Sequence, residues 1–282
     1  MFCRIRSIPL MFIGVYNNTY EGDYNMSKSA TSETAQEFVT ALCEQARTHR
    51  AVNHPYLQKL IAGDVPDIKS AMRDFVFQYS AYTFDFIRYL TATISQLEDE
   101  SHRKSLTRNL VEESGSVYDD NAEILPTIGI ELEWVNNVPH TELFWRYMEA
   151  AGAGAEYRKK TPYAEEAIMW RELFYTVCSH KGPCHALGAI GLGTENIVKY
   201  IYSPFIKAIE NHLDISRRDR VFFDAHVALD DQHGDALTQI AIDYAAKPEN
   251  RKAIKEGMLM ALSIRGTFFD ALEARANAMQ PA

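Results

Sequence analysis

Apolar side chains recur at intervals of three and four residues along most of the chain. This spacing is the period of an α-helix that buries one face, and the alternation typical of β-strands is missing from the sequence. The pattern therefore predicts an all-α protein. The predicted helices span residues 32–46, 54–63, 67–97, 101–115, 141–151, 165–178, 183–212, 217–245 and 248–279.

Proline, glycine and capping residues mark the ends of these helices. Pro139 suits a first helical turn, and Ser216 with Asp219 resembles a capping box that opens the helix after it. We expect Pro204 to bend its helix without ending it, because the apolar period continues beyond it. Residues 116–138 break the period and are expected to form an inserted loop or short irregular pieces. The remaining helices are predicted to line one central cavity.

The first 26 residues differ in character from the rest. An arginine-bearing apolar run, MFCRIRSIPLMFIGVY, has no clear small-residue cleavage site behind it, and NNTYEGDYN resembles a flexible linker. Met26 then opens a segment with the look of an ordinary start, MSKSATSETAQEF. We expect residues 1–26 to reflect an upstream start codon or to be a dispensable extension, and residues 27–282 to form a single domain.

Composition narrows the class of protein. With 46% hydrophobic and 24% charged residues, the 282-residue chain can bury a large core. Its net charge of -9 argues against a nucleic-acid partner, which would need a basic stripe. Four cysteines without a C-x-x-C pair argue against a zinc knuckle and fit a cytoplasmic protein. No apolar run is long enough to span a bilayer, so we expect no membrane partner.

The segment FFDAHVALDDQH carries the strongest chemical signal. His226, Asp230 and His233 stand at positions i, i+4 and i+7, which share one face of a helix. Two imidazoles and one carboxylate with open positions suit non-haem iron. A hydrogen-bonded surface cluster is the alternative, but apolar neighbours flank the three residues, and unpaired polar groups are costly when buried. Asp231 and Asp235 fall elsewhere on the helix and are expected to face solvent.

A site for two metal ions requires further carboxylates from facing helices. Glu195 is an isolated acid in the apolar segment GLGTENIVKY, although an acid at the surface of a kinked helix would give the same pattern. Glu113, in RNLVEESG, is the second candidate. Its neighbour Glu112 leaves open which of the two faces inward.

Six segments resemble the haem-oxygenase-like di-iron oxidases and oxygenases, in the same order along the chain. They are HPYLQKLIAGDV, FVFQYSAYTFDF, RNLVEESG, PHTELFWRYMEAAG, GTENIVKYIYSPF and FFDAHVALDDQH, and they cover roughly residues 50–245. The H-x-x-x-D-x-x-H element is the most specific of them, and all of its ligand positions are filled. The resemblance implies a haem-oxygenase-like helical bundle.

The resemblance also implies a set of metal ligands. The residues that match the family's motifs are Glu113, His140, Glu195, His226, Asp230 and His233. His140 is the least direct match, because the family places a histidine soon after the N-L-x-E-E-x-G element, just before a helix that begins H-x-x-L. Here that helix begins only after the insertion of residues 116–138. Asp119 or Asp120 is the competing ligand, because these residues stand where the family's histidine would fall without an insertion.

From the same resemblance we expect two ferrous ions as cofactors and dioxygen as co-substrate. The enzyme would oxidise, cleave or oxygenate a small organic acid or amino acid. Tyr79, Tyr82 and Phe86 are expected to wall its pocket, although an aromatic stripe at helical spacing also suits plain core. By analogy, the insertion would act as a lid. A second copy of the chain, forming a homodimer, is also considered as a partner.

The sequence leaves two other functions open. One is a cofactorless enzyme of the same fold, akin to thiaminase or the pyrroloquinoline quinone synthase, and the ligand set argues against it. The other is a non-enzymatic helical protein with a metal-stabilised core.

Cys178 and Cys184 lack a neighbouring base and are not expected to be nucleophiles. Five other histidines are expected to be structural; they are His54, His102, His180, His185 and His212.

Overall fold

The structure is a computed structural model that describes residues 33–280, apart from the side chains at positions 119–120 and 230–233. Its α-helices are α1 (Ala35–Thr48), α2 (Pro55–Ala62), α3 (Ile68–Thr83), α4 (Phe86–Gln96), α5 (Glu100–Glu113), α6 (Asp119–Thr127), α7 (His140–Ala150), α8 (Ala155–Lys160), α9 (Glu165–His180), α10 (Pro183–Leu187), α11 (Val198–His212), α12 (Val221–Ala245) and α13 (Pro248–Asn277). Short helical turns are η1 (Leu132–Trp134), the π-helical η2 (Gly188–Leu192) and η3 (Glu195–Ile197).

The prediction of an all-α fold is confirmed, since no strand occurs within residues 33–280. None of the helices in that range combines the length and the apolar content needed to cross a membrane. The expected extension of residues 1–26 lies outside the described residues.

Side-chain caps explain where several helices begin. Thr34 and Glu37 form a reciprocal capping box at the start of α1. Asp67 and Asp99 accept backbone N–H groups at the starts of α3 and α5. These acceptors satisfy N–H groups that have no partner within the first helical turn, so the starts are encoded locally.

The prediction of one helix over residues 67–97 is wrong, because the structure has two helices there, α3 and α4. The Phe84 N–H bonds to the Ser80 carbonyl, whereas the Asp85 N–H bonds to the carbonyl of Tyr82, only three residues earlier. This tighter turn ends the α-helical ladder. Periodicity did not reveal the break because the second half of α3 is buried on nearly every side and shows no polar face.

Two other predicted helices also differ from the structure. The Ser216 hydroxyl accepts from the Asp219 N–H and donates to the Asp219 carboxylate, which is only half of a capping box. These bonds close a turn, and α12 begins at Val221. The predicted helix over residues 183–212 is divided into α10, η2, η3 and α11. Its GAIGLG stretch holds three glycines, which form helix poorly and tolerate irregular turns. Pro204 lies inside α11 without ending it, as predicted.

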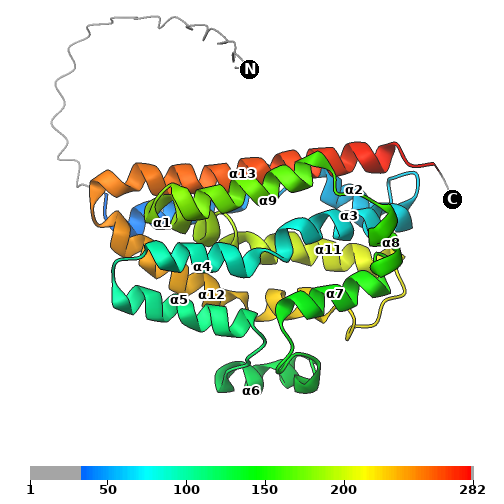
Figure 1. Ribbon diagram of the computed structural model, residues 1–282, viewed down its shortest axis with the longest axis horizontal. Coiled ribbons are helices and arrows are strands. Elements are labelled where there is room, and N and C mark those ends of the chain that lie inside the picture. Colours follow the sequence, from blue (N-terminus) through cyan, green and yellow to red (C-terminus); the bar gives the residue numbers. More distant parts are fainter. Residues whose placement is uncertain (1–32, 281–282) are drawn as a thin grey trace, which may run out of the picture. The chain divides into compact units, whose positions relative to one another are not determined.

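The long helix α13 forms one side of the bundle, beside α9 (Figure 1). Against it, α10 and η2 pack with no side chain between the backbones. A Cβ on Gly188 would lie 2.0 Å from the Ile254 carbonyl oxygen, and a Cβ on Gly257 would lie 2.1 Å from that of His185. These glycines therefore fix η2, and with it the start of η3, against α13.

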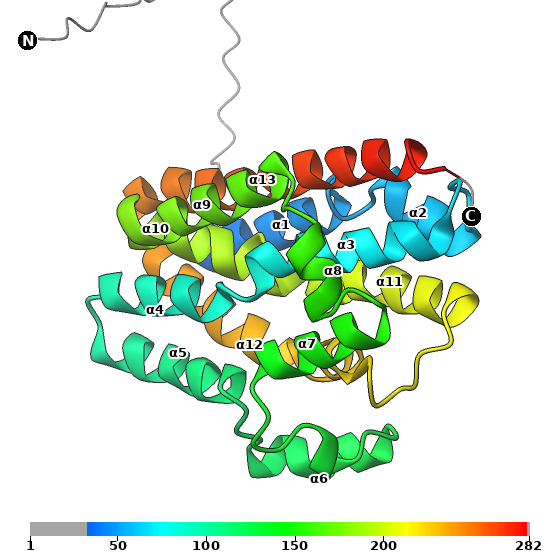
Figure 2. The ribbon, with the colours of Figure 1, turned by 45° about the vertical axis from the view of Figure 1, so that its right-hand side comes forward.

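The insertion leaves the bundle and returns to it at one place. The Asn137 N–H donates to the Gly115 carbonyl at 2.7 Å, and both residues have positive φ, 105° for Gly115 and 60° for Asn137. Between them, α6 and η1 are the short pieces that were predicted. Figures 1 and 2 show α6 at the edge of the bundle, on the side of α5, α7 and α12. This neck holds the end of α5 beside the start of α7.

Candidate metal centre

Glu113 and His140 meet at the neck of the insertion. Glu113 ends α5 and is buried, and His140 begins α7. His140 Nδ1 lies 2.9 Å from Glu113 Oε2, yet this buried nitrogen has no hydrogen-bond partner among the described residues, because the two groups are not aligned for a hydrogen bond. A metal ion would satisfy such a nitrogen beside a carboxylate. The neighbouring acid Glu112 pairs instead with Arg108, at 3.3 Å.

His226 brings a second imidazole to the same place from α12. Its ring centroid lies 4.8 Å from that of His140. The ligand atoms of Glu113, His140 and His226 all lie within 4.8 Å of one another, and these three residues are called the donor cluster below. His226 Nδ1 lies 2.6 Å from the Phe222 carbonyl oxygen and donates to it. That hydrogen bond leaves the lone pair of the ring on Nε2, which suits a metal ligand.

Glu195 lies on the same cavity as the donor cluster. It is the first residue of η3 and is buried. Glu195, Glu113, His140 and His226 all line one cavity between the helices. The alternative interpretation of Glu195, as an acid at the surface of a kinked helix, is therefore wrong. The π-helical turn η2, fixed by its glycines, carries Glu195 into the interior. Single π-helical turns of this kind are common at functional sites.

Asp230 and His233 lie on α12, which continues unbroken through both positions. Their side chains are outside the described residues, as are those of Asp119 and Asp120. The predicted i, i+4, i+7 spacing with His226 is kept by the helix. The structure places His140 within the donor cluster. The competing ligands Asp119 and Asp120 stay untested, because their side chains are outside the described residues.

Aromatic rings form much of the wall of this cavity. Tyr79, Tyr82 and Phe86 line it, as expected from the sequence. Tyr202 was missed: its ring centroid lies 5.7 Å from that of His226 and nearly perpendicular to it. No sequence signal marked Tyr202, because its partner belongs to another helix.

A second cavity reaches the donor cluster from the insertion. Leu125 and Val135 of the insertion line it together with Leu143 and Leu229, and His140 and His226 also line it. Its lining is mostly apolar. The insertion thus builds one wall of a cavity beside the donor cluster, and its expected role as a lid stays a prediction.

This donor set suits iron better than a structural zinc ion. Two imidazoles with a buried carboxylate, and a second buried carboxylate on the same cavity, match the mixed nitrogen and oxygen ligands of non-haem iron. No cysteine belongs to the cluster, although structural zinc sites commonly use thiolates.

Comparison with known proteins agrees with this chemistry. Residues 73–266, more than half of the chain, match a family described as iron-containing redox enzymes. The chain belongs to this family. No curated protein matches its sequence.

Solved structures share the fold of this iron-containing redox enzyme family member. A domain of unknown function from Shewanella denitrificans, described as having a heme oxygenase-like fold, aligns with a TM-score of 0.62 and 16% identity, over 84% of this chain and 89% of that one. A TenA homolog from Pseudomonas syringae aligns with a TM-score of 0.66 and 14% identity, over 91% and 100%. A CADD-like protein of unknown function from Nostoc punctiforme aligns at 0.67 and 15%, over 86% and 99%. The fold is therefore the predicted haem-oxygenase-like bundle.

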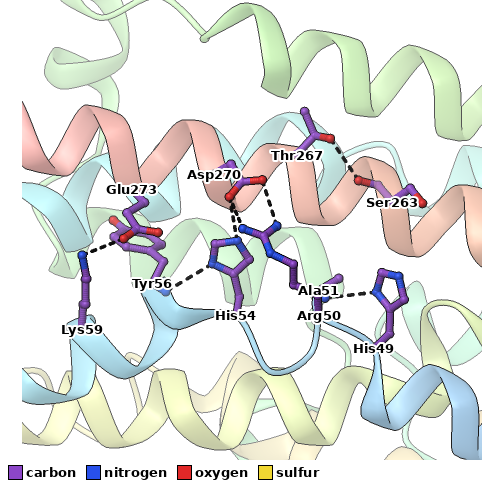
Figure 3. Close-up of polar contacts among 10 residues, drawn as sticks. All are labelled: His49, Arg50, Ala51, His54, Tyr56, Lys59, Ser263, Thr267, Asp270 and Glu273. Carbon is purple, nitrogen blue, oxygen red and sulfur yellow. Dashed lines mark hydrogen bonds and ion pairs between the residues drawn. The ribbon is translucent and has the colours of Figure 1, made fainter.

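A second cluster of potential ligands, His54, Asp270 and Glu273, is better explained as an ion-pair network (Figure 3). His54 Nδ1 accepts from the Tyr56 N–H at 3.2 Å, so its Nε2 carries the proton and donates to Asp270 at 3.2 Å. Both ring nitrogens are thus engaged. Each carboxylate also has a cation, Arg50 at 2.9 Å from Asp270 and Lys59 at 2.8 Å from Glu273. The network ties the start of α2 to α13.

This network predicts a loss of stability in mild acid. Burial lowers the pKa of His54 below its ordinary value of 6.5. The unfolded chain therefore binds this proton more readily, so the contribution of His54 to stability is present above pH 6.5 and falls as the pH drops below it. We expect the free energy of unfolding to fall more between pH 7 and pH 5 in the wild type than in His54→Asn, which keeps a side-chain cap for α2. Urea titrations at both pH values would measure it, and an equal fall in both proteins would contradict this role of His54.

Two of the other histidines and one cysteine have structural surroundings. His102 pairs with Asp243 at 2.9 Å, and His212 Nε2 donates to the Ile61 carbonyl at 2.9 Å. Burial raises the pKa of the Cys178 thiol to about 12, so it stays protonated and is a poor nucleophile.

Proposed function

We propose that this protein is a dioxygen-dependent oxidoreductase that holds two ferrous ions and oxidises a small organic acid or amino acid. The observation that carries the proposal is the donor cluster: three residues from α5, α7 and α12 bring their ligand atoms within 4.8 Å of one another in the interior. The proposed ligands are Glu113, His140, Glu195, His226, Asp230 and His233. Iron bound there would supply the capacity to bind and reduce dioxygen, which side chains alone lack.

The chain's own residues prepare this site in three ways. The Phe222 carbonyl fixes the tautomer of His226, so that Nε2 keeps its lone pair. The neck between Gly115 and Asn137 holds Glu113 next to His140. Aromatic side chains line the cavity, and a lining of this kind limits the access of water to a reactive oxidant.

Iron content and dioxygen uptake test the proposal on the full chain. We expect the purified protein, loaded anaerobically with ferrous iron, to retain about two iron ions per chain in its bundle core and to consume dioxygen. Glu113→Gln should lower both, because the amide lacks the negative charge of the carboxylate. Glu142→Gln is the matched control, since Glu142 is exposed on α7 close to His140.

Each alternative predicts a different result. A cofactorless enzyme, which the TenA-like neighbour keeps under consideration, would retain no iron. A metal-stabilised protein without enzymatic activity would retain iron and consume no dioxygen with any substrate offered. Either result would overturn the proposed function.

A further inference from the structure

Arg265 is a fully buried cation in α13, next to the candidate metal centre. Its side chain has no exposed surface. Its guanidinium donates to the Tyr79 hydroxyl at 3.3 Å and to the Thr194 hydroxyl at 3.4 Å, and it lies 5.7 Å from the centre of the Tyr82 ring. Among the described residues it forms no ion pair with a carboxylate, and its Nε has no hydrogen-bond partner. A buried guanidinium without an anion is costly, so it is expected to have a function.

The residues around Arg265 form part of the wall of the cavity. Tyr79, Tyr82 and Thr194 all line the cavity that also holds the donor cluster. The positive charge therefore lies one layer behind the wall. Thr194 accepts from Arg265, and its hydroxyl also interacts with that of Tyr82, so the two hydroxyls lie side by side on this wall.

The Tyr82 hydroxyl is a donor on this wall. Tyr82 is 3% exposed, and apart from its neighbour Thr194 its hydroxyl has no hydrogen-bond partner among the described residues. Burial raises the pKa of this phenol, so it stays protonated and can donate. A phenylalanine would pack equally well without the penalty of an incompletely paired buried hydroxyl. The hydroxyl is therefore expected to bind something that enters the cavity.

The charge balance indicates what that ligand is. In the proposed ligand set, three carboxylates balance three of the four positive charges of two ferrous ions. Arg265 adds a further positive charge in the same dry region. An entering anion would offset this excess, whereas a neutral or cationic ligand would not.

We propose that Tyr82 and Thr194, with Arg265 behind them, form the subsite for the carboxylate of the substrate. The two hydroxyls donate to the carboxylate oxygens, and Arg265 is a positioning residue that acts through them. This proposal rests on the proposed function and deepens it, because it makes an anionic carboxylate the group by which the substrate is recognised.

The test is a binding measurement with a matched pair of probes. The protein, loaded with ferrous iron under argon, is titrated by calorimetry with phenylacetate and with phenylacetamide, which differ in charge and little in shape. We expect phenylacetate to bind more tightly. Tyr82→Phe should weaken phenylacetate about tenfold or more, as expected for the loss of a hydrogen bond to a charged group, and should leave phenylacetamide little changed.

Tyr147→Phe is the matched control. Tyr147 is another fully buried tyrosine whose hydroxyl lacks a partner among the described residues, and it is not part of the cavity wall. This variant should bind both probes as the wild type does. Arg265→Lys, which keeps the charge, should retain more of the preference for phenylacetate than Arg265→Met.

Two results would overturn the subsite. One is a wild type that binds phenylacetate no more tightly than phenylacetamide; the other is a Tyr82→Phe variant that keeps the wild-type preference. Iron content is measured on the same samples. A protein that retains no iron refutes the proposed function by that measurement alone, while the comparison of the two probes still decides the fate of the subsite.

Discussion

Replacing His226 with alanine is expected to abolish iron retention and dioxygen consumption while leaving the helical fold intact. The variant removes one of the two imidazoles in the donor cluster, whose ring lies 4.8 Å from that of His140. Changes to groups that merely orient a metal ligand already cost about 10- to 100-fold in affinity or activity, so loss of a ligand should exceed that. The fold should survive, because His226 lies within α12, where alanine is the best helix former.

Asp235→Ala is the control for this experiment. Asp235 lies on the same helix and is exposed, as the sequence predicted. Its replacement should change stability by no more than about 0.5 kcal/mol and leave iron retention unchanged. The measurements are iron per chain after anaerobic loading, the rate of dioxygen uptake, and the circular dichroism of both variants. If His226→Ala retained its iron and Asp235→Ala lost it, the assignment of the metal-binding face of α12 would be wrong.

The helices were predicted well from the sequence where one face is buried and the opposite face is exposed to solvent. The prediction failed where burial removes that contrast. The second half of α3 is buried on nearly every side, so no polar face marked the break before α4. The turn at Glu195 was hidden for a different reason. The GAIGLG stretch can adopt several helical turns, and its packing against the backbone of α13 selects one of them.

In the candidate site, some features follow from local spacing and others depend on contacts between distant residues. The spacing of His226, Asp230 and His233 is local, so a helix period was enough to predict that they share one face. The meeting of Glu113 with His140 depends on the neck of the insertion, a contact that spacing alone does not encode. Tyr82 gave no sequence signal as a donor, because its significance depends on the distant residue Arg265.

Gly257→Ala is expected to destabilise the protein by about 3 kcal/mol, at the upper end of the usual cost of overpacking, and to lower iron retention as well. The new Cβ would lie 2.1 Å from the His185 carbonyl oxygen, a backbone atom that cannot rotate away. Relief of this clash requires α13 to move away from α10 and η2, which carry Glu195 into the cavity.

Gly266→Ala is the matched control, because Gly266 is a buried glycine in the same helix. Its Cβ would meet no atom closer than 3.8 Å, so the variant should be neutral or stabilise the protein by about 0.5–1 kcal/mol. Urea unfolding of the iron-free variants measures the stability difference, and iron loading measures the effect on the site. Equal stabilities for the two variants would mean that the backbone contact between α13 and α10 does not hold the start of η3 in place.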